Sequence, residues 1–412
     1  MVSVCFYFQV HQPVRMRRYP VFDIGRDSDY FDHKKNEQVV KKVAKKCYLP
    51  TNRLINELIR KTRGKFRVSY SITGTALEQF QEFAPEVIES FKELADTGHV
   101  EFLSETYYHT LAYLYSKQEF REQVSLHKKM VRKHFKQTPR IFRNTELVYN
   151  NELARTVEDM GYKGILAEGA DHILGWRSPN YIYQPQTSKK IRLLLKNYKL
   201  SDDIAFRFSN RGWSEHPLTA RKFADWVAAA EGQTVNLFMD YETFGEHQWE
   251  DTGIFSFLEH LPSELMRHSH IDFRNPSEMA RLEPVGKLDV HHPVSWADVE
   301  RDLSAWLGNR MQQSAIQRLY ELESYIRRSG DKGLLEDWRK LQTSDHFYYM
   351  CTKWFSDGDV HKYFNPYDSP YDGFIAFMNA VNDIVIRLKT IGMKSKALNS
   401  CYVLPPSIVG EI

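Results

Sequence analysis

The chain has few cysteines, and they follow no recognisable pattern. Only four occur among the 412 residues, at positions 5, 47, 351 and 401, and no two of them form a CxxC pair. The lack of such a pair argues against a thiolate zinc site and against a thioredoxin-like redox motif. Scattered cysteines are typical of a reducing compartment.

Long apolar runs, internal repeats, low-complexity segments and an excess of one charge are also absent. The first apolar run, residues 2–10, is too short to cross a membrane and has no basic segment before it, as a signal peptide would. A formal net charge of +3 with 26% charged residues favours neither a nucleic-acid partner nor a membrane surface. We therefore predict a cytoplasmic protein without either partner, and the sequence leaves its oligomeric state open.

Aromatic residues, by contrast, are abundant, with 23 Tyr, 25 Phe and 8 Trp. Most aromatic side chains fill hydrophobic cores. Some form flat platforms for partly apolar ligands such as sugar rings, and composition alone leaves both uses open.

Seven short apolar runs are bounded by polar or glycine-containing turns, and helical patterns lie between most of them. Several runs are apolar almost without interruption, which is typical of parallel strands that are covered on both faces. The alternation predicts either a closed parallel β/α barrel or a doubly wound sheet. The runs are residues 2–10, 66–72, 99–103, 140–142, 162–167, 191–195 and 235–239.

The helical patterns also predict where helices are interrupted and where the strand-containing part of the chain ends. Residues 39–59 predict two helices separated by a break at 49–52, and residues 170–186 predict a long loop. After about residue 250 the patterns are almost entirely helical, over 255–268, 296–328, 334–352 and 371–390. We therefore expect a strand-containing catalytic domain over 1–250 and a helical region over 251–412 that packs on it and contributes to the cleft.

The stretch from 235 to 249 changes abruptly from an apolar run to acids and aromatic rings. Asp240, Glu242 and Glu246 follow the run, together with Tyr241, Phe244, His247 and Trp249. Parallel α/β folds carry their chemistry at the carboxyl ends of strands, so this stretch predicts part of a site. Glu242 shares a strand face with Asp240 if the strand continues, and is its main rival as a proton donor.

Other predicted strands end in similar residues. His11 follows the first run and can donate a hydrogen bond to a ligand hydroxyl, although a buried structural histidine is an equally ordinary interpretation. After the third run, Glu101 and Glu105 share one strand face, with His109 shortly beyond. These acids fit a site and fit surface ion pairs about equally well.

Glu146 stands alone among apolar and small polar neighbours after the fourth run. An isolated carboxylate there needs hydrogen bonds or a cation to stay ionised, and Arg143, Asn144 and Tyr149 are near in sequence. Glu146 and Asp240 thus come from the ends of two different strands. Such paired carboxylates are the usual means of cleaving a glycosidic bond.

In order and spacing, these segments resemble the five conserved regions of glycoside hydrolase family 57, in its α-amylase-type members. The resemblance spans essentially the whole chain. It rests on residues 11–13 (His-Gln-Pro), 98–101 (Gly-His-Val-Glu), the segment around Glu146, residues 238–245 (Phe-Met-Asp-Tyr-Glu-Thr-Phe-Gly) and residues 295–306.

The resemblance implies a (β/α)7 barrel with a helical C-terminal region and a retaining reaction on α-1,4-glucans or maltooligosaccharides. It implies Glu146 as the nucleophile and Asp240 as the general acid/base, with no cofactor and no metal. Burial and the neighbouring negative charge are expected to raise the pKa of Asp240. The expected substrate-binding residues are His11, Glu101, His109, Trp213, His247, Trp249 and Trp296, whereas Trp306 fits a core position better.

Three alternatives remain at this stage. A 4-α-glucanotransferase or glucan branching enzyme of the same family would use the same two carboxylates with a sugar hydroxyl as acceptor. A metal-dependent polysaccharide deacetylase would need clustered ligands such as HxxxH, and none of the 16 histidines are four apart. A non-catalytic glucan-binding protein would not need both acids.

Overall fold

The computed structural model describes residues 1–353, 365–393 and 398, and in it the chain forms two compact units. The first unit contains Met1–Pro13, Lys34–Tyr113 and Gln118–Leu303. The second contains Val14–His33, Leu114–Lys117 and the chain from Ser304 onward. The division of the chain into domains 1–250 and 251–412 stays a prediction, and these units differ from it because the first continues to Leu303.

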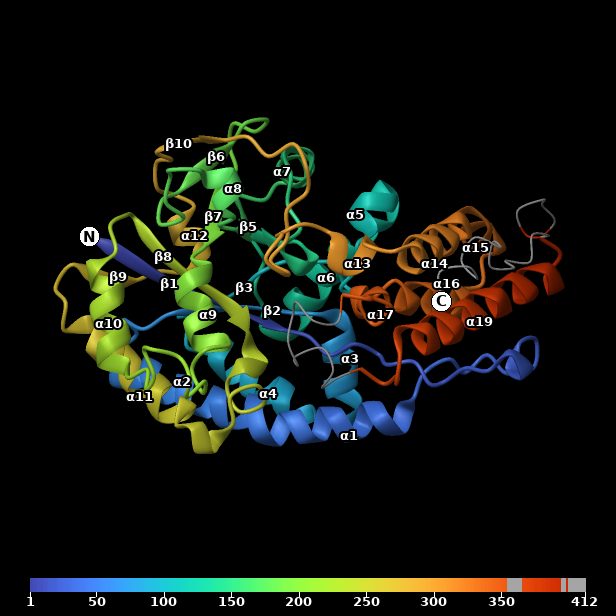
Figure 1. Ribbon diagram of the computed structural model, residues 1–412, viewed down its shortest axis with the longest axis horizontal. Coiled ribbons are helices and arrows are strands. Elements are labelled where there is room, and N and C mark those ends of the chain that lie inside the picture. Colours follow the sequence, from blue (N-terminus) through green and yellow to red (C-terminus); the bar gives the residue numbers. More distant parts are fainter. Residues whose placement is uncertain (354–364, 394–397, 399–412) are drawn as a thin grey trace. The chain divides into compact units, whose positions relative to one another are not determined.

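The first unit is built around parallel strands, and each of the seven predicted runs overlaps one of them (Figure 1). One sheet has the order β3-β2-β1-β8, and in a second sheet β4, β5 and β7 lie side by side. All of these pairings are parallel. The strands are β1 (Val2–Val10), β2 (Val68–Ile72), β3 (Val100–Phe102), β4 (Ile141–Arg143), β5 (Gly164–Glu168), β7 (Arg192–Lys196) and β8 (Thr234–Asp240).

Hydrogen bonds join the two sheets at both seams. Beyond β3, the backbone N–H of Ser104 donates to Ile141 of β4 (3.0 Å), and Arg143 donates back to Ser104 (2.8 Å). Beyond β7, the N–H of Asn197 donates to the carbonyl of Asn236 in β8 (2.9 Å). The seven strands therefore close into a (β/α)7 barrel, as predicted, and the doubly wound alternative is wrong.

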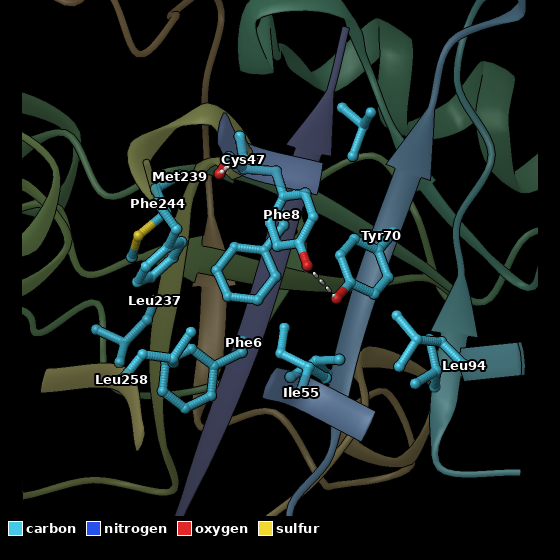
Figure 2. Packing of buried hydrophobic residues seen from close by; sticks show 14 of the residues in the cluster. Phe6, Phe8, Cys47, Ile55, Tyr70, Leu94, Leu237, Met239, Phe244 and Leu258 are labelled. Atoms are coloured by element: carbon cyan, nitrogen blue, oxygen red, sulfur yellow. Dashed lines mark hydrogen bonds between the residues drawn. The ribbon is translucent and has the colours of Figure 1, made fainter. Parts of the chain in front are cut away.

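Side-chain alternation divides the buried strand residues between two faces. Phe6, Phe8 and Tyr70 point outward into a large cluster with the surrounding helices, where Phe8 lies 5.7 Å from Phe244, ring centre to ring centre (Figure 2). Cys5, Tyr7, Leu166, Leu194 and Phe238 belong to a separate, smaller cluster that fills the barrel. The continuous apolarity of the strands thus has a direct cause, since both faces are covered.

The inward face becomes polar at the carboxyl ends of the strands. One alternation step beyond Tyr7 and Phe238 come Gln9 in β1 and Asp240 in β8, which are register partners. By the same alternation Arg143, Glu168 and Lys196 end β4, β5 and β7 on this face. A layer of charged and amide side chains therefore lies on top of an apolar barrel interior.

Helices cover the outside of the barrel, and most of them contribute buried residues to the outer cluster. The predicted break at 49–52 is wrong, because a π-helix, Ala44–Tyr48, connects α1 to α2 without an interruption. The proline that suggested the break, Pro50, comes shortly after this π-helix, where the regular hydrogen-bond pattern is already changed. The helices include α1 (His33–Val43), α2 (Leu49–Lys61), α3 (Gly74–Phe83), α4 (Pro85–Asp96), α6 (Lys117–Phe135), α7 (Asn151–Asp159), α9 (Tyr198–Ala205), α10 (Ala220–Ala229) and α11 (Ile254–Met266).

Several short elements were not predicted. The expected loop over 170–186 contains α8 (Asp171–Leu174) and β6 (Tyr183–Pro185). After residue 250 the chain adds β9 (Ile271–Phe273), which pairs with β1, and β10 (Gly286–Leu288), which pairs with β6. The helix expected from 296 begins only at Ser304, with α13 (Ser304–Leu307). The intervening segment contains Trp296 and belongs to the barrel unit.

The second unit is mainly helical within the described residues. It contains α14 (Arg310–Glu321), α15 (Glu323–Ser329), α16 (Lys332–Leu341), α17 (Ser344–Tyr348) and α19 (Pro370–Thr390). Asp383 of α19 accepts a hydrogen bond from the Tyr30 hydroxyl (2.6 Å), and Arg387 donates to Asp337 (2.7 Å). None of the described helices is long and apolar enough to cross a membrane.

Candidate active site

Glu146 lies in a tight turn directly after β4, in a backbone conformation that L-amino acids rarely adopt. Its φ and ψ are 57° and 23°, and the next residue, Leu147, also has a positive φ of 51°. Two successive non-glycine residues in the left-handed region cost about 1–2 kcal/mol each. Such strain persists where the surroundings hold it, and it is common at functional sites.

Both carboxylate oxygens of Glu146 accept hydrogen bonds from side chains brought from distant segments. The indole N–H of Trp296 donates to Oε2 (2.8 Å), and Nε2 of His109 lies 3.2 Å from Oε1. The backbone N–H of Trp296 also donates to the Glu146 carbonyl (3.1 Å). The carboxylate is therefore fixed in orientation and lies against an N–H donor on each side.

The second ring nitrogen of His109 connects this contact to a buried chain of hydrogen bonds. His109 Nδ1 lies 3.2 Å from Oε2 of Glu105, which has no exposed side-chain surface. Gln9 donates to the other oxygen of Glu105 (3.0 Å) and accepts from the Tyr7 hydroxyl (2.6 Å). The imidazole of His109 thus lies between the buried carboxylate of Glu105 and the carboxylate of Glu146.

The contact between Glu105 and His109 shifts the pKa values of both groups. Burial alone would raise the pKa of Glu105, but the hydrogen bond from His109 and the charges of His109 and Arg143 outweigh it and lower the pKa to about 2. Burial would lower the pKa of His109, but its bonds to Glu105 and Glu146 raise it to about 9. At neutral pH, His109 is therefore an imidazolium that donates to both carboxylates.

Asp240 is in a different environment. Burial, followed by the charge of Glu146, raises its pKa to about 6, although Arg143, His109 and Lys196 act in the opposite direction. This agrees with the predicted direction and with both predicted causes. Glu146 is thus held by N–H donors, while Asp240 retains a proton more readily than an ordinary aspartate.

Glu242, the predicted rival of Asp240, is anchored toward the helices. It accepts a hydrogen bond from the hydroxyl of Tyr48, in the π-helix, and Tyr48 in turn accepts one from Gln12 (3.0 Å). Burial, followed by the charge of Asp240, raises the pKa of Glu242 to about 8, against the effect of the Tyr48 bond. Glu242 is therefore a neutral, buried neighbour of Asp240 at pH 7.

Arg143, at the end of β4, is a fully buried cation. Its guanidinium lies 4.9 Å from the ring centre of Trp296, and its Nη1 is 3.8 Å from Glu105 Oε2. Its nitrogens have no hydrogen-bond acceptor among the described residues. Arg143 was one of three sequence neighbours that could stabilise Glu146, but the structure pairs it with Glu105 and the Trp296 ring instead.

His11 is also brought to the site. Its ring stacks on that of His109, with centroids 4.0 Å apart and planes at 21°, and its Nδ1 lies 2.9 Å from the Thr73 hydroxyl. The structure therefore brings together five of the predicted site residues, namely His11, His109, Glu146, Asp240 and Trp296.

Glu101 is not among them. It is level with Tyr7 through their common pairing with Ser69, one inward-facing layer below Gln9 and Asp240. Its carboxylate accepts the backbone N–H of Ser277 (2.9 Å), and burial, opposed by this bond, raises its pKa to about 7. The acid that bonds to His109 is Glu105, two alternation steps beyond Glu101, so substrate contact by Glu101 stays a prediction that these contacts do not favour.

The contacts of the remaining predicted residues, Trp213, Trp249 and His247, are with other parts of the barrel unit. Trp213 packs on Trp226 (6.1 Å between ring centres) beside the outer hydrophobic cluster, so its predicted role lacks support. Trp249 is half-exposed, with Lys46 Nζ 4.8 Å from its ring centre. His247 lies in the turn after Asp240 and donates its backbone N–H to Glu242 (2.9 Å). Substrate contact by Trp249 and His247 stays a prediction.

Three residues of the site were missing from the predicted set, namely Gln9, Glu105 and Arg143. Period-two alternation carries a signal for each, since they lie on the inward face at or just beyond a strand end. Within residues 1–353, 365–393 and 398, no group of three or more His, Cys, Asp or Glu side chains is placed to hold a metal ion.

Comparison with known proteins gives a consistent picture. Residues 5–291 match the profile of Glycosyl hydrolase family 57. A protein of Methanocaldococcus jannaschii named "Putative alpha-amylase" is 45% identical over 410 residues, which cover 95% of this chain and 86% of that protein.

Solved structures with the same fold are more distant in sequence. The 4-alpha-glucanotransferase of Thermococcus litoralis superposes with a TM-score of 0.68 at 14% identity, over 96% of this chain and only 60% of that enzyme. A branching enzyme of Thermococcus kodakaraensis gives a TM-score of 0.66 at 14% identity, over 96% and 93% of the two chains. At this identity the likeness concerns the fold.

Proposed function

The chain belongs to glycosyl hydrolase family 57, and we propose that it cleaves α-1,4-glucans with retention of configuration, in the manner of an α-amylase. Glu146 is the proposed nucleophile and Asp240 the proposed general acid/base. The observation that carries this assignment is the contrast between the two carboxylates. Glu146 accepts N–H donors on both oxygens, and its charge contributes to the raised pKa of Asp240.

In the first step, Glu146 attacks the anomeric carbon while Asp240 donates its proton to the leaving oxygen. Attack requires an ionised, oriented carboxylate, and the His109 imidazolium and the Trp296 indole favour both. A pKa of about 6 lets Asp240 carry a proton near neutral pH. The contacts thus support opposite protonation states for the two acids.

In the second step, water attacks the glycosyl-enzyme ester and Asp240 accepts the proton. Formation of the ester removes the negative charge of Glu146, which is one of the two causes of the raised pKa of Asp240. The pKa of Asp240 therefore falls once the intermediate has formed, and the same carboxyl group becomes a base. The charge of Glu146 thus controls the pKa of Asp240, which is the physical reason for placing the proton donor next to the nucleophile.

Among the predicted substrate-binding residues, His11 is the one we assign to contact with a bound sugar, whereas both ring nitrogens of His109 already bond to Glu105 and Glu146. Trp296 is less suited to stacking on a sugar ring, because Arg143 and Lys196 lie 4.9 and 5.5 Å from its ring centre. We assign its indole to the orientation of Glu146. We also propose a cytoplasmic location, which the small number of cysteines and their scattered positions in the sequence favour.

A second candidate is glucan transfer by the same two carboxylates. The shared fold with a 4-alpha-glucanotransferase and a branching enzyme favours it. Only the acceptor differs, since a sugar hydroxyl replaces water. A product profile from maltooligosaccharides distinguishes the two, because hydrolysis yields only shorter chains whereas transfer also yields longer or branched ones.

The direct test is hydrolysis of maltooligosaccharides and starch by Glu146→Gln and Asp240→Asn. We expect each to lower kcat/KM about 10³-fold or more. Glu242→Gln is the matched control, since glutamine imitates the neutral Glu242 and still accepts the Tyr48 hydrogen bond. Activity retained in either of the first two variants, or lost only in the control, would overturn the assignment.

A further inference from the structure

The segment from Ser295 to Asp302 leads into the second unit and carries Trp296, yet it has no helix or strand of its own. Two of its residues, Asp298 and Arg301, have positive φ angles of 55° and 53°. Within the segment, the N–H of Ser295 donates to the Arg301 carbonyl (3.0 Å), and the Ser295 hydroxyl donates to the Asp302 carbonyl. These two hydrogen bonds close the segment into a turn. Two of its residues have a backbone conformation that L-amino acids rarely adopt, so we expect contacts outside the turn to hold it in place.

Arg301 connects this turn to the ends of the barrel strands. Its Nη1 donates to the carbonyl of Trp296 and lies 3.6 Å from Glu168 Oε2, at the end of β5. Its Nη2 lies 3.6 Å from Asp202 in α9. One planar guanidinium therefore contacts the turn and two carboxylates, which the fixed fork of an arginine allows and a lysine does not.

Lys196, at the end of β7, completes this group of charges. It donates to Asp202 (3.0 Å), lies 3.7 Å from Glu168 and is 5.5 Å from the ring centre of Trp296. Glu168 is fully buried, and burial raises its pKa against the charges of Lys196 and Arg301. Two acids and two cations, from the ends of β5 and β7, from α9 and from the turn itself, thus form one group of charges.

We propose that Arg301 is a positioning residue for the candidate nucleophile and acts through Trp296. The guanidinium fixes the Trp296 carbonyl, and Trp296 in turn donates its backbone N–H and its indole N–H to Glu146. Arg301 itself does not contact Glu146 in the described structure. The effect on the reaction rests on the proposed role of Glu146, whereas the effect on Trp296 does not.

Loss of this support lets the Trp296 turn relax and loosens the carboxylate that the turn orients. A displacement of about 1 Å in a reacting group can cost roughly 100-fold in rate. We therefore expect Arg301→Gln to lower kcat/KM by about 10- to 100-fold, mainly through kcat, because the residue affects the nucleophile rather than the binding of remote sugars.

The kinetic test is a double-mutant cycle of Arg301→Gln and Trp296→Phe on maltooligosaccharides. Phenylalanine keeps an aromatic ring and the backbone but lacks the indole donor. If Arg301 acts through Trp296, its loss costs much less in the Trp296→Phe background than in the wild type. Fully additive losses would contradict the proposal.

A second measurement does not depend on any activity. In protein labelled with ¹⁵N at its eight tryptophans, the indole N–H of Trp296 is the signal that Trp296→Phe removes. We expect this signal to shift and to exchange faster with solvent in Arg301→Gln. An unchanged Trp296 signal overturns the proposal, whereas a wild type that is inactive on glucans overturns only the proposed function.

Arg192→Gln is the matched control. Arg192 is also an arginine of the barrel unit, with 17% of its side chain exposed against 15% for Arg301, and it also pairs with a glutamate and donates to a backbone carbonyl. It lies at the opposite end of β7 from Lys196, so the Trp296 signal should stay unchanged in this variant. If Arg301→Gln does not fold, Arg301→Lys keeps the charge without the fork, and the same signal decides the proposal.

Discussion

Replacing His109 with asparagine tests the charge that links Glu105 to Glu146. Asparagine suits the site because it tolerates the positive φ of 53° at this position and keeps one N–H donor. It cannot become a cation near neutral pH. The substitution therefore removes the imidazolium while leaving the backbone conformation accessible.

The magnitude follows from the raised pKa. A histidine whose pKa rises from 6.5 to about 9 on folding favours the folded state by about 3 kcal/mol. Because the folded pKa is the higher one, this stabilisation is complete below pH 6.5 and is lost as the pH rises to 9. The two contacts responsible are the hydrogen bonds to Glu105 and Glu146.

The assay is guanidinium chloride unfolding of the wild type and His109→Asn at a series of pH values from 6 to 10. We expect the difference in the free energy of unfolding between the wild type and the variant to decrease by about 3 kcal/mol from pH 6 to pH 10. Glu101 and Glu242 also have raised pKa values, but both proteins contain them, so their effect cancels in the difference. Parallel stability curves for the two proteins would refute the reasoning.

His127→Asn provides a control of opposite sign. His127 is buried between the backbone N–H of Glu105 and the carbonyl of Ile72, and burial lowers its pKa. Its contribution to stability is therefore present above pH 6.5 and lost as the pH falls below it. Between pH 6.5 and 10 this variant keeps His109, and its curve should run parallel to that of the wild type.

Four further predictions concern this site and the turn that follows Asp240. Glu146→Gln removes a charge that raises the pKa of Asp240, so the Asp240 titration should move to lower pH in an NMR experiment, and an unchanged value would contradict the assigned cause. Glu146→Gly should be more stable toward denaturant than Glu146→Ala by about 1 kcal/mol, because glycine alone adopts the left-handed conformation freely; the opposite order would argue against that backbone. Arg143→Met removes a charge that lowers the pKa of Asp240, so the basic limb of the kcat/KM profile should move to higher pH, and a move to lower pH would refute this electrostatic role. Gly245→Ala should cost several kcal/mol of stability, since a Cβ there would lie 2.0 Å from the carbonyl oxygen of Lys46, whereas Gly98→Ala, with a similarly positive φ but open space, should cost only about 1 kcal/mol.

Much of the barrel follows from the sequence because its strands carry a strong signal. Apolar runs covered on both faces stand out between polar turns, and all seven coincide with strands. Glu146 and Asp240 stand out for the same reason, since Asp240 directly follows such a run and Glu146 follows another after three residues. The three-residue strands β9 (Ile-Asp-Phe) and β10 (Gly-Lys-Leu) contain polar residues or glycine and form no apolar run, so they were not predicted.

The points that the sequence did not predict also have physical causes. Glu101 lies in β3 and Glu105 three residues beyond its end, and alternation gives the face of each acid but not its layer, which depends on register with the neighbouring strands. The turn around Trp296 was predicted as helix because Trp296, Val299, Leu303 and Trp306 are spaced like a helical face. A turn forms there instead of a helix. Arg301 in this turn contacts Glu168 at the end of β5 and Asp202 in α9, and these partners come together only in the folded barrel.

The most direct test of the two assigned roles is the anomeric configuration of the azide product formed from α-maltosyl fluoride, which needs no acid to activate its leaving group. In Asp240→Ala the ester on Glu146 still forms, and azide should open it to give the α-maltosyl azide, with net retention. In Glu146→Ala azide should replace the nucleophile and give the β-maltosyl azide by a single inversion. The reverse pairing of variants and products, measured by NMR, would contradict Glu146 as nucleophile and Asp240 as acid/base.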